Sequence, residues 1–492
     1  MAGKALILVE NLSVPFDRRV WQECLALRAD GWDVHVICPQ GTAQDTEPYA
    51  EIDGVRIHRY PLRAAVGGPL GYLQEYASAL WHTYRLGRRI GPVDVVHACN
   101  PPDLFFLIAR RFKRTGATFV FDQHDLVPEL YLSRFARGED FLYRAVCWLE
   151  KQTYRAADVV ISTNESYRTA ALTRGGKEPG QVFVVRSAPT VERFRQVPAD
   201  ESIRKDKQYL LCYLGVMGPQ DGVDYALRAL AKLRDELGRT DWHAVFMGGG
   251  DTYDAMVALA GELGLADCVE FTGRIPDDDL LRYLSTADVC LSPDPLNPLN
   301  DVSTMNKIME YMAMARPIVS FELKEARVSA GEAAVYAPAN DEAAFAALIA
   351  ELLDDPAERK RMGEIGRQRV GGALSWEHSR AELLRAYRAA VAQPGPAPSI
   401  PRQRGTATRV GTPGVAAAPA QPRQRPVEHQ NGQIASAVER AHPAAAHHRG
   451  EVAEAEPALR GGTAQLGQLP VAAPDPHPPV QIGGDGPGRS DQ

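Results

Sequence analysis

The chain has 492 residues, of which 45% are hydrophobic, and its 55 basic and 62 acidic side chains leave a formal net charge of −7. This length can bury two ordinary cores, and the mildly negative balance argues against a general nucleic-acid-binding protein. Three features predict a cytoplasmic protein. The seven cysteines are scattered without metal or redox spacing, the amino-terminal apolar run is too short for a signal peptide, and no stretch is long enough to span a bilayer.

Short apolar runs alternate with longer helical patterns in the first half of the chain. Helical patterns include 18–30 and 102–115, and we expect strands at 5–9, 34–38, 93–97, 118–121 and 159–162. This alternation predicts an α/β fold with a doubly wound parallel sheet.

The alternation restarts after a polar stretch at 198–207. We expect further strands at 209–214, 244–247, 269–272, 289–291 and 318–321. Helical patterns follow at 341–354, 356–370 and 376–391. Two Rossmann-like domains facing a cleft are the simplest architecture, and ligands of such sheets bind beyond the carboxyl ends of the strands. Functional side chains are therefore expected in the loops that follow strands.

The composition changes after residue 392. From Gln393 onward the chain is rich in Pro, Ala, Gly, Gln and Arg and has almost no large apolar residues, so it cannot bury enough surface to offset its chain entropy. We therefore place one domain at 1–200, a second at 201–392 and a disordered tail at 393–492. The last helix, 376–391, is a candidate to pack back on the first domain.

The segment 300–320 carries the most informative pattern. One face has apolar side chains at helical spacing: Met305, Ile308, Met309 and Met312. The other face has polar ones: Ser303, Asn306, Lys307 and Glu310. We expect a helix that Ser303 or Thr304 caps, whose N-terminus can bind a phosphate while Glu310 holds vicinal ribose hydroxyls. An amphipathic core helix with a Lys307–Glu310 surface pair explains the same pattern, and this alternative stays open.

Five segments in this order resemble the retaining glycosyltransferases of family 4, whose two-domain fold is called GT-B. They are LCYLGVMGPQDGVDYALRAL, VFMGGGDTYDAM, FTGRIPDDDLLRYLSTADVCLSP, NKIMEYMAMARPIV and SWEHSRAELLRAY. The resemblance covers roughly the first four-fifths of the chain. It implies an acceptor-side N-terminal domain and a donor-nucleotide-binding C-terminal domain, with the helix at 303–313 receiving the diphosphate and ribose.

The chain departs from the family pattern at two places. Glu310 matches the second glutamate of the family's E-x7-E motif, but the position of the first is Val302. Asp301, after a one-residue shift, or Asn300 with backbone amides are the two substitutes. The family's usual Arg and Lys after the first strand of the C-terminal domain match Val216 and Asp221.

The missing cations are therefore expected from elsewhere. Lys307 is the first choice, and Arg18 or Arg19 in the loop VPFDRRVWQE is the second. Solvent exposure of Lys307 and an Asp17–Arg19 pair at a helix start are the structural alternatives.

His124 follows a strand, and the family places a histidine there near the donor sugar and acceptor. Asp122, Asp125 and Glu129 surround it in sequence, so a carboxylate can orient its imidazole or act on the acceptor hydroxyl. His97 and Asn100 end the preceding strand and are expected to line the same pocket.

Glycine-containing loops complete the expected donor site. Gly215 lies in the loop after the first strand of the C-terminal domain, and Gly249 lies in a Gly-Gly-Gly turn, although such glycines often serve only the turn. Arg274 is placed by the resemblance near the nucleotide base. The helix dipole explains the acidic run 277–279, so we expect no obligatory metal.

The N-terminal domain also carries a basic and aromatic set that suits an anionic lipid surface: Trp81, Arg85, Arg88, Arg89, Arg134, Phe135, Arg137, Tyr143, Arg144 and Trp148. Peripheral contact with the inner face of the membrane, with a lipid-linked acceptor, is one alternative; packing of the aromatics in the core is the other.

The resemblance implies transfer of a hexosyl group from a nucleoside-diphosphate-sugar to a hydroxyl acceptor, a glycolipid or polysaccharide precursor, with retention at the anomeric carbon. The expected catalytic residues are His124, Asp301 and Lys307, and no bound cofactor besides the donor is expected. A sugar-nucleotide 2-epimerase of the same fold and a non-catalytic sugar-nucleotide-binding protein remain open alternatives.

Overall fold

The computed structural model describes residues 2–41, 45–62, 68–135, 138–189 and 193–392. The tail predicted to be disordered, 393–492, lies outside these residues. The described chain forms two sheets, one of eight strands and one of six. The prediction of two doubly wound α/β domains is confirmed.

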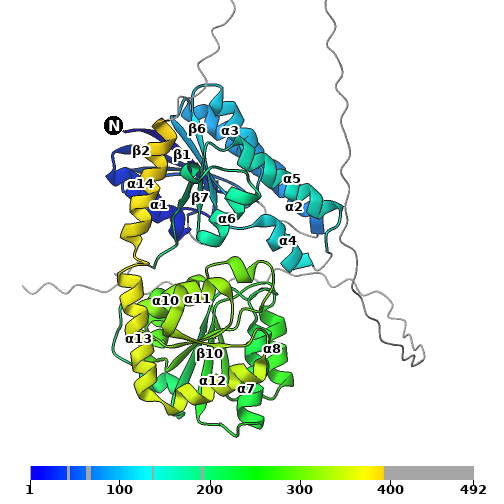
Figure 1. Ribbon diagram of the computed structural model, residues 1–492, viewed down its shortest axis with the longest axis vertical. Helices are drawn as coiled ribbons and strands as arrows, with labels where there is room; N and C mark the ends of the chain where they lie inside the picture. Colours follow the sequence, from blue (N-terminus) through cyan, green and yellow to red (C-terminus); the bar gives the residue numbers. More distant parts are fainter. Residues whose placement is uncertain (1, 42–44, 63–67, 136–137, 190–192, 393–492) are drawn as a thin grey trace, which may run out of the picture. The chain divides into compact units, whose positions relative to one another are not determined.

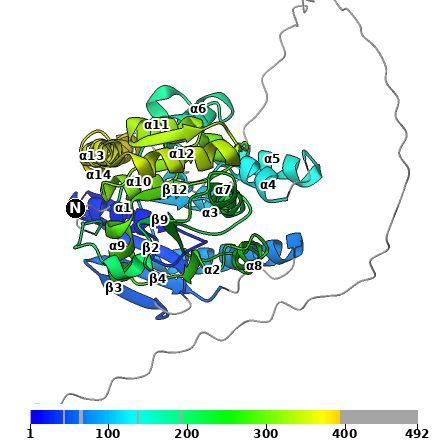
Figure 2. The ribbon, with the colours of Figure 1, turned by 90° about the horizontal axis from the view of Figure 1, so that it is seen from below.

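The eight-stranded sheet has the order β3-β4-β2-β1-β5-β6-β7-β8 and is parallel except for the β3–β4 hairpin. Its strands are β1 Gly3–Leu8, β2 Trp32–Pro39, β3 Tyr49–Ile52, β4 Val55–Tyr60, β5 Val95–Cys99, β6 Thr118–Gln123, β7 Val159–Ser162 and β8 Val182–Val184. Its helices are α1 Arg18–Ala29, α2 Gly68–Ile90, α3 Phe106–Lys113, α4 Val127–Phe135, α5 Phe141–Ala156 and α6 Glu165–Thr173. We call this part the N-terminal lobe; α4 and α5 lie side by side in it (Figure 2).

The six-stranded sheet is parallel throughout, in the order β11-β10-β9-β12-β13-β14. Its strands are β9 Tyr209–Leu214, β10 Trp242–Met247, β11 Val269–Gly273, β12 Val289–Ser292, β13 Ile318–Phe321 and β14 Ala334–Ala337. Its helices are α7 Val223–Asp235, α8 Tyr253–Glu262, α9 Asp277–Thr286, α10 Asn306–Ala313, α11 Lys324–Ala330, α12 Glu342–Asp354 and α13 Pro356–Gly371. This part is the C-terminal lobe. Short 3₁₀ turns are η1 Pro179–Gln181, η2 Glu201–Arg204, η3 Asn300–Val302 and η4 Gly331–Ala333.

The last helix, α14 Trp376–Ala392, follows α13 but packs on the N-terminal lobe (Figure 1). Leu383, Tyr387 and Ala390 belong to the same buried cluster as Ala5 and Ile7 of β1. The helix contacts α1 and strands β6, β7 and β8. Helix α14, at the end of the described residues, therefore completes the core of the lobe to which β1 belongs.

Four strands do not appear among the runs predicted from sequence: β3, β4, β8 and β14. Edge strand β3 alternates exposed and half-buried residues, and β4 alternates buried and half-buried ones along most of its length. Strand β8 is only three residues long, and the two middle residues of β14 are half-buried. Short or half-exposed strands lack the continuous apolar run that marks a strand buried on both faces.

Candidate functional site

Helix α10 begins three residues later than the sequence pattern predicts. It starts at Asn306, and no side chain caps it. The expected cap residues are bonded elsewhere: the Ser303 hydroxyl donates to a backbone carbonyl four residues earlier (2.8 Å), and the Thr304 hydroxyl accepts from the amide of Asn164 (3.1 Å). The capping prediction is therefore wrong. Asn306 is exposed at the positive end of the helix, where an anion is favoured.

Lys307 is buried, not exposed. Its side chain is 7% exposed, and Nζ lies 2.6 Å from Oδ1 of Asp294, which is itself 1% exposed. Burial opposes the charge of Lys307, but Asp294 and Tyr213 outweigh burial and hold its pKa above the usual value. Both structural alternatives for Lys307, solvent exposure and a surface pair with Glu310, are therefore wrong. The catalytic role of Lys307 stays a prediction, with its charge already balanced by Asp294.

The two substitutes for the missing glutamate both hold loops together. Oδ1 of Asp301 accepts from the backbone N–H of Lys324, the first residue of α11 (2.9 Å). Asn300 is 2% exposed, and its amide donates to the backbone carbonyls of Gln220 and Pro295 (both 2.8 Å). The amide hydrogens of Asn300 are thus committed, and contact between Asp301 and a sugar stays a prediction.

Glu310 is the exception on the polar face of α10. It is half-buried, and no hydrogen bond or ion pair engages its carboxyl group among the described residues. Burial raises the pKa of Glu310 to about 7, opposed by the positive charges of Arg18 and Arg193. A partly desolvated carboxyl group that faces cations suits a ligand that brings hydroxyl donors.

Arg18 lies within a group of charged side chains beside Glu310. Its Nη2 is 3.6 Å from Oδ1 of Asp277, and its side chain is 54% exposed. Arg193 holds the same carboxylate through Nε (2.6 Å) and Nη2 (2.5 Å), which keeps the pKa of Asp277 low. The pKa of Arg18 is lowered by burial and then by Arg193, with a further contribution from Arg274. Asp277 thus binds an arginine, beyond its expected role at the start of α9.

Arg19, by contrast, is committed within the N-terminal lobe. Its Nη2 donates to Oδ1 of Asp122 (2.9 Å) and its Nη1 to the carbonyl of Val185 (2.8 Å), while its side chain is 10% exposed. The expected Asp17–Arg19 pair is not formed, because Asp17 caps α1 through the N–H of Val20 (3.1 Å). The assignment of Arg19 to a donor phosphate stays a prediction, with its guanidinium already bound to Asp122 and Val185.

His124 is oriented by a carboxylate, as predicted. Its Nε2 lies 2.7 Å from Oδ2 of Asp122, and its side chain is 14% exposed. Burial lowers the pKa of His124, but Asp122 reverses this effect and the net pKa is raised. The same Nε2 also lies 3.1 Å from Nε of Arg19, which only donates, but the contact with Asp122 is the shorter one. Since a carboxylate only accepts, we assign a hydrogen to Nε2, and Nδ1 is the ring atom left for a ligand.

Two neighbours of His124 differ from expectation. His97 is 0% exposed, so it cannot line a pocket. Glu129 is paired with Arg174 (2.6 Å), so it does not serve His124. Asn100 has a clear role, since its Oδ1 accepts from the backbone N–H groups of His124 (2.7 Å) and Asp125 (3.1 Å).

The glycine-rich loops of the C-terminal lobe continue the pairing of their strands. The N–H of Gly215 donates to Met247 (3.0 Å), and the N–H of Gly248 donates to Gly273 (2.9 Å). A Cβ at Gly249 would meet nothing within 4 Å, so this residue faces open space. Gly215, Gly249 and the exposed Arg274 therefore lie at the carboxyl edge of the sheet, as the sequence predicts.

The comparisons with known proteins agree with this arrangement. The family model described as "Glycosyl transferases group 1" matches residues 208–355, and the one described as "Glycosyl transferase 4-like domain" matches residues 17–188. The chain belongs to the bacterial group-1 glycosyltransferases of the family 4 type. The two matches include all six strands of the C-terminal lobe and seven of the eight strands of the N-terminal lobe.

Curated relatives and solved structures cover most of this glycosyltransferase. Glycogen synthase of Mycobacterium tuberculosis (strain ATCC 25618 / H37Rv) is 26% identical over 410 residues, which cover 78% of this chain and 93% of that protein. D-inositol 3-phosphate glycosyltransferase of Salinispora arenicola is 25% identical over 395 residues, covering 74% and 85%.

Among solved structures, sucrose-phosphate synthase from Thermosynechococcus elongatus superposes with a TM-score of 0.65 at 22% identity, covering 79% of this chain and 99% of that one. Anabaena HepE in complex with UDP-glucose superposes with a TM-score of 0.59 at 16% identity, covering 79% and 100%. These likenesses establish the GT-B fold.

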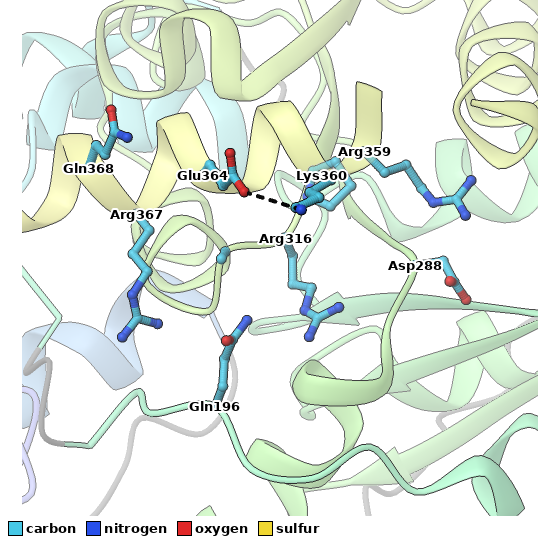
Figure 3. Close-up of a pocket in the computed structure, with 10 residues that line it drawn as sticks. Gln196, Asp288, Arg316, Arg359, Lys360, Glu364, Arg367 and Gln368 are labelled. Atoms are coloured by element: carbon cyan, nitrogen blue, oxygen red, sulfur yellow. Dashed lines mark ion pairs between the residues drawn. The ribbon is translucent and has the colours of Figure 1, made fainter. Parts of the chain in front are cut away.

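A hollow of about 730 Å³ lies away from these residues, at the amino ends of β12 and β13 of the glycosyltransferase (Figure 3). Its basic lining is explained by helix ends. Arg316 donates to carbonyls at the end of α9 (2.6 and 2.8 Å), Arg359 to those at the end of α12 (2.5 and 2.6 Å), and Arg367 to the last residue of α10 (3.4 Å). Cations there neutralise the negative ends of three helices, so we do not assign the hollow to the donor.

Three members of the site are not predicted from the sequence: Arg193, Asp294 and Glu23. Arg193 lies in the segment that joins the two lobes, where a basic residue carries no motif. Asp294 comes directly after β12, and the rule that functional side chains follow strands could have found it. In the sequence, Glu23 fits the pattern of the amphipathic helix α1 and carries no further signal. Only the structure shows that its carboxyl group is buried (0% exposed).

Proposed function

We propose that this glycosyltransferase moves a hexosyl group from a nucleoside-diphosphate-sugar to a hydroxyl acceptor with retention of the anomeric configuration. Glu310 carries the proposal, because it is the carboxyl group at the expected ribose position that no protein partner engages. Two oxygens on one carboxylate can accept from two vicinal hydroxyls, and charged acceptors give the stronger hydrogen bonds.

The cations for the leaving diphosphate come, in this proposal, from Arg18 and Arg193. Both lie beside Glu310 and Asp277, and the side chain of Arg18 is half exposed. With the backbone N–H groups at the start of α10, they would stabilise the negative charge that grows on the diphosphate as the sugar passes through an oxocarbenium-like state. No bound metal is needed in this scheme.

The acceptor side of the reaction is assigned to His124. Its Nδ1 would bind the transferred sugar or the acceptor, while Asp122 holds the ring through Nε2. The departing phosphate oxygen would take the proton of the acceptor hydroxyl, on the face of the sugar from which the phosphate leaves, and so retain the configuration. Closing the two lobes on the donor would exclude water.

The acceptor is proposed to be lipid-linked. Trp81 of α2 and Trp148 of α5 are 55% and 58% exposed, and Phe141 at the start of α5 is 82% exposed. Exposed basic residues accompany them on the same helices: Arg85, Arg88, Arg89 and Arg144. Aromatic and basic side chains together suit the headgroup layer of an anionic bilayer.

The other members of that surface support it less. Arg134 is exposed but paired with Asp251 (2.7 Å), and Tyr143 is half-buried. Arg137 and the side chain of Phe135 lie outside the described residues. Within the described chain, no helix combines the length and the apolar character that crossing a membrane requires.

The test is incubation of the protein with radiolabelled UDP- and GDP-sugars, with and without a bacterial lipid extract. We expect nucleotide release that depends on the extract. The label should be recovered in lipid, as a sugar with the same anomeric configuration as in the donor. Isomerised sugar nucleotide without acceptor would instead identify a 2-epimerase, and binding without turnover a non-catalytic protein. A product with the inverted anomeric configuration would overturn only the proposed retention and not the sugar transfer itself.

A further inference from the structure

Three buried polar side chains lie behind His124 and take no part in the reaction proposed above. Glu23 of α1 and His97 of β5 are 0% exposed, and Tyr387 of α14 is 1% exposed. All three belong to the N-terminal lobe, although Tyr387 comes from the far end of the described chain.

Glu23 is a carboxyl group without a well-aligned hydrogen bond. Its Oε1 is 3.1 Å from Nη2 of Arg19 and its Oε2 is 3.7 Å from Nε2 of His97, but neither contact meets hydrogen-bond geometry. A buried charge short of hydrogen bonds is destabilising. A neutral amide of the same shape would serve packing better, so packing alone does not explain a carboxyl group here.

Asp122 joins Glu23 to His124. Its Oδ1 accepts from Arg19 (2.9 Å), and its Oδ2 lies 2.7 Å from Nε2 of His124 and 3.3 Å from Nε2 of His97. Arg19 bridges both carboxyl groups, since the same Nη2 faces Asp122 and Glu23. The protonation of Glu23 therefore affects the protonation of His124, and the reverse, because both belong to one small group of side chains with little water.

His97 is locked by the last helix. Its Nδ1 lies 2.9 Å from the hydroxyl of Tyr387. Since carboxylates only accept, Nε2 of His97 carries its hydrogen toward Asp122 and Glu23, and Nδ1 accepts from the Tyr387 O–H. The hydroxyl thus fixes one tautomer and one orientation of the ring.

The charges of this group balance with one proton to spare. When Arg19 is positive and Asp122 negative, the remaining proton can sit on His124 with Glu23 ionised, or on Glu23 with His124 neutral. The net charge is zero in both cases, so moving the proton buries no additional net charge.

We infer that Glu23 is a positioning residue that shares one proton with His124 through the charges of Asp122 and Arg19, and that the Nε2 of His97, oriented by Tyr387, faces both carboxyl groups at 3.3 and 3.7 Å without a well-aligned hydrogen bond. In the exchange the O–H bond of Glu23 breaks and the Nδ1–H bond of His124 forms, with the proton passing by way of solvent. Nε2 keeps its hydrogen toward Asp122, and Arg19 and Asp122 couple the two sites through their charges and are themselves unchanged. The catalytic meaning of the exchange rests on the proposed function, whereas the exchange itself is a property of the folded lobe.

The titration behaviour of the two groups is compatible with sharing. Burial, reinforced by Asp122, raises the pKa of Glu23 to about 7, and Asp122 raises the pKa of His124 against the effect of burial. Cys99 stays neutral because burial holds its pKa well above the usual value. The charged and titratable groups that face Glu23 are Arg19 and Cys24 of α1, His97 and Cys99 of β5, Asp122 and His124 at the end of β6, and Tyr387 of α14.

Nuclear magnetic resonance of the full chain, labelled with ¹⁵N in histidine, tests the inference without any substrate. The ring signals of His124 are assigned with His124→Gln and followed from about pH 5.5 to about pH 9. In Glu23→Gln the midpoint should fall by roughly 0.5 to 1 unit, because a negative charge that stabilises the imidazolium is lost. Glu165→Gln, which removes an exposed carboxylate of α6, is the control and should leave the midpoint in place.

An unchanged His124 midpoint in Glu23→Gln overturns the inference. Should that variant fail to fold, Tyr387→Phe frees His97 and should also lower the midpoint, whereas Tyr336→Phe, which removes a hydroxyl bonded 2.9 Å from a carbonyl of the C-terminal lobe, should not. Equal His124 midpoints in Tyr387→Phe and Tyr336→Phe would likewise overturn the inference. If Glu23→Gln shifts the His124 midpoint while the wild-type protein transfers no sugar, the proposed function is refuted but the shared proton is not.

Discussion

The carbonyl oxygen of Gly215 occupies the space that a side chain at position 248 would need. A Cβ built on Gly248 would lie 1.9 Å from that oxygen, and the φ of Gly248 is +134°. Neighbouring Gly249 has no atom within 4 Å of the same position. One glycine of the turn is therefore required by the close approach of two loops, and the next is not.

Replacement of Gly248 by Ala should be strongly destabilising, while Gly249→Ala should be tolerated. We expect a loss of roughly 2 kcal/mol or more for Gly248→Ala, from overpacking against backbone and an unfavourable φ, and less than about 0.5 kcal/mol for Gly249→Ala. Urea unfolding of both variants measures the difference. Equal stability of the two would contradict the close contact between the loops.

Glu310→Gln should weaken donor binding and remove its pH dependence. Loss of a charged acceptor for two hydroxyls should raise the dissociation constant for the donor by roughly ten- to a hundredfold. Because the pKa of Glu310 is about 7, wild-type affinity should rise between pH 6 and pH 8 as the carboxylate forms. Calorimetric titration with the donor measures both effects. Glu364→Gln, at an exposed carboxylate of α13, is the matched control; a pH dependence that survives in Glu310→Gln would exclude Glu310 as its source.

Arg193→Gln should reduce affinity for a nucleoside diphosphate, whereas Arg195→Gln should not. Arg193 is held beside Arg18 by Asp277, while Arg195, two residues on, is exposed. We expect a loss of about 1.5–3 kcal/mol in binding, the usual range for a hydrogen bond to a charged group, and a weaker dependence on salt. Similar effects of the two substitutions would show that the cations act only through the general field of the lobe.

The main effect of breaking the Lys307–Asp294 ion pair should be a loss of protein stability, not a direct effect on catalysis. Both side chains are buried and 2.6 Å apart, so Asp294→Asn leaves a buried positive charge unpaired, at a loss of about 3–5 kcal/mol. The double variant Lys307→Met/Asp294→Asn should lose clearly less than the sum of the single losses. The exposed pair Lys360–Glu364 provides the control cycle, with a coupling below about 1 kcal/mol. A coupling as small as that of the control would contradict a tight buried pair.

Asp103→Asn should stabilise the protein at alkaline pH. Burial, followed by the charge of Glu150, raises the pKa of Asp103 to about 8, well above its value in an unfolded chain. The folded state then holds a proton that the unfolded state releases. This contribution is complete below the unfolded value of 3.8 and is lost as pH rises toward 8, by about 1.4 kcal/mol per pH unit while only the folded form binds the proton.

Thermal unfolding between pH 5 and pH 9 measures this effect. The amide of Asn100 donates to Asp103 (3.1 Å), and an asparagine at position 103 can accept the same bond without ionising. The melting temperature of Asp103→Asn should therefore fall less steeply with pH than that of the wild type. Parallel curves would show that Asp103 does not hold a proton in the folded state.

Local patterns carried most of the architecture. Strands 159–162, 209–214 and 318–321 were predicted to the residue, because a parallel strand buried on both faces needs a continuous apolar run. The start of α10 was predicted three residues early, because Ser303 and Thr304 are good caps in isolation. Their hydroxyls are engaged by Tyr167 and Asn164 of the N-terminal lobe, and no local pattern encodes those partners.

The sequence by itself determined the two sheets, the family and the helix that carries Glu310, since spacing and apolar runs act over a few residues and survive in any context. Only the tertiary structure decided which charges are available. Lys307 and Arg19 are neutralised by Asp294 and Asp122, which are buried and lie 13 and 103 residues away in sequence. Arg18 and Arg193 share one half-exposed carboxylate, Asp277, near Glu310. The physical reason is that the Coulomb energy of a side chain depends on the distance and burial of its partners in space, and neither quantity can be read from neighbours along the chain.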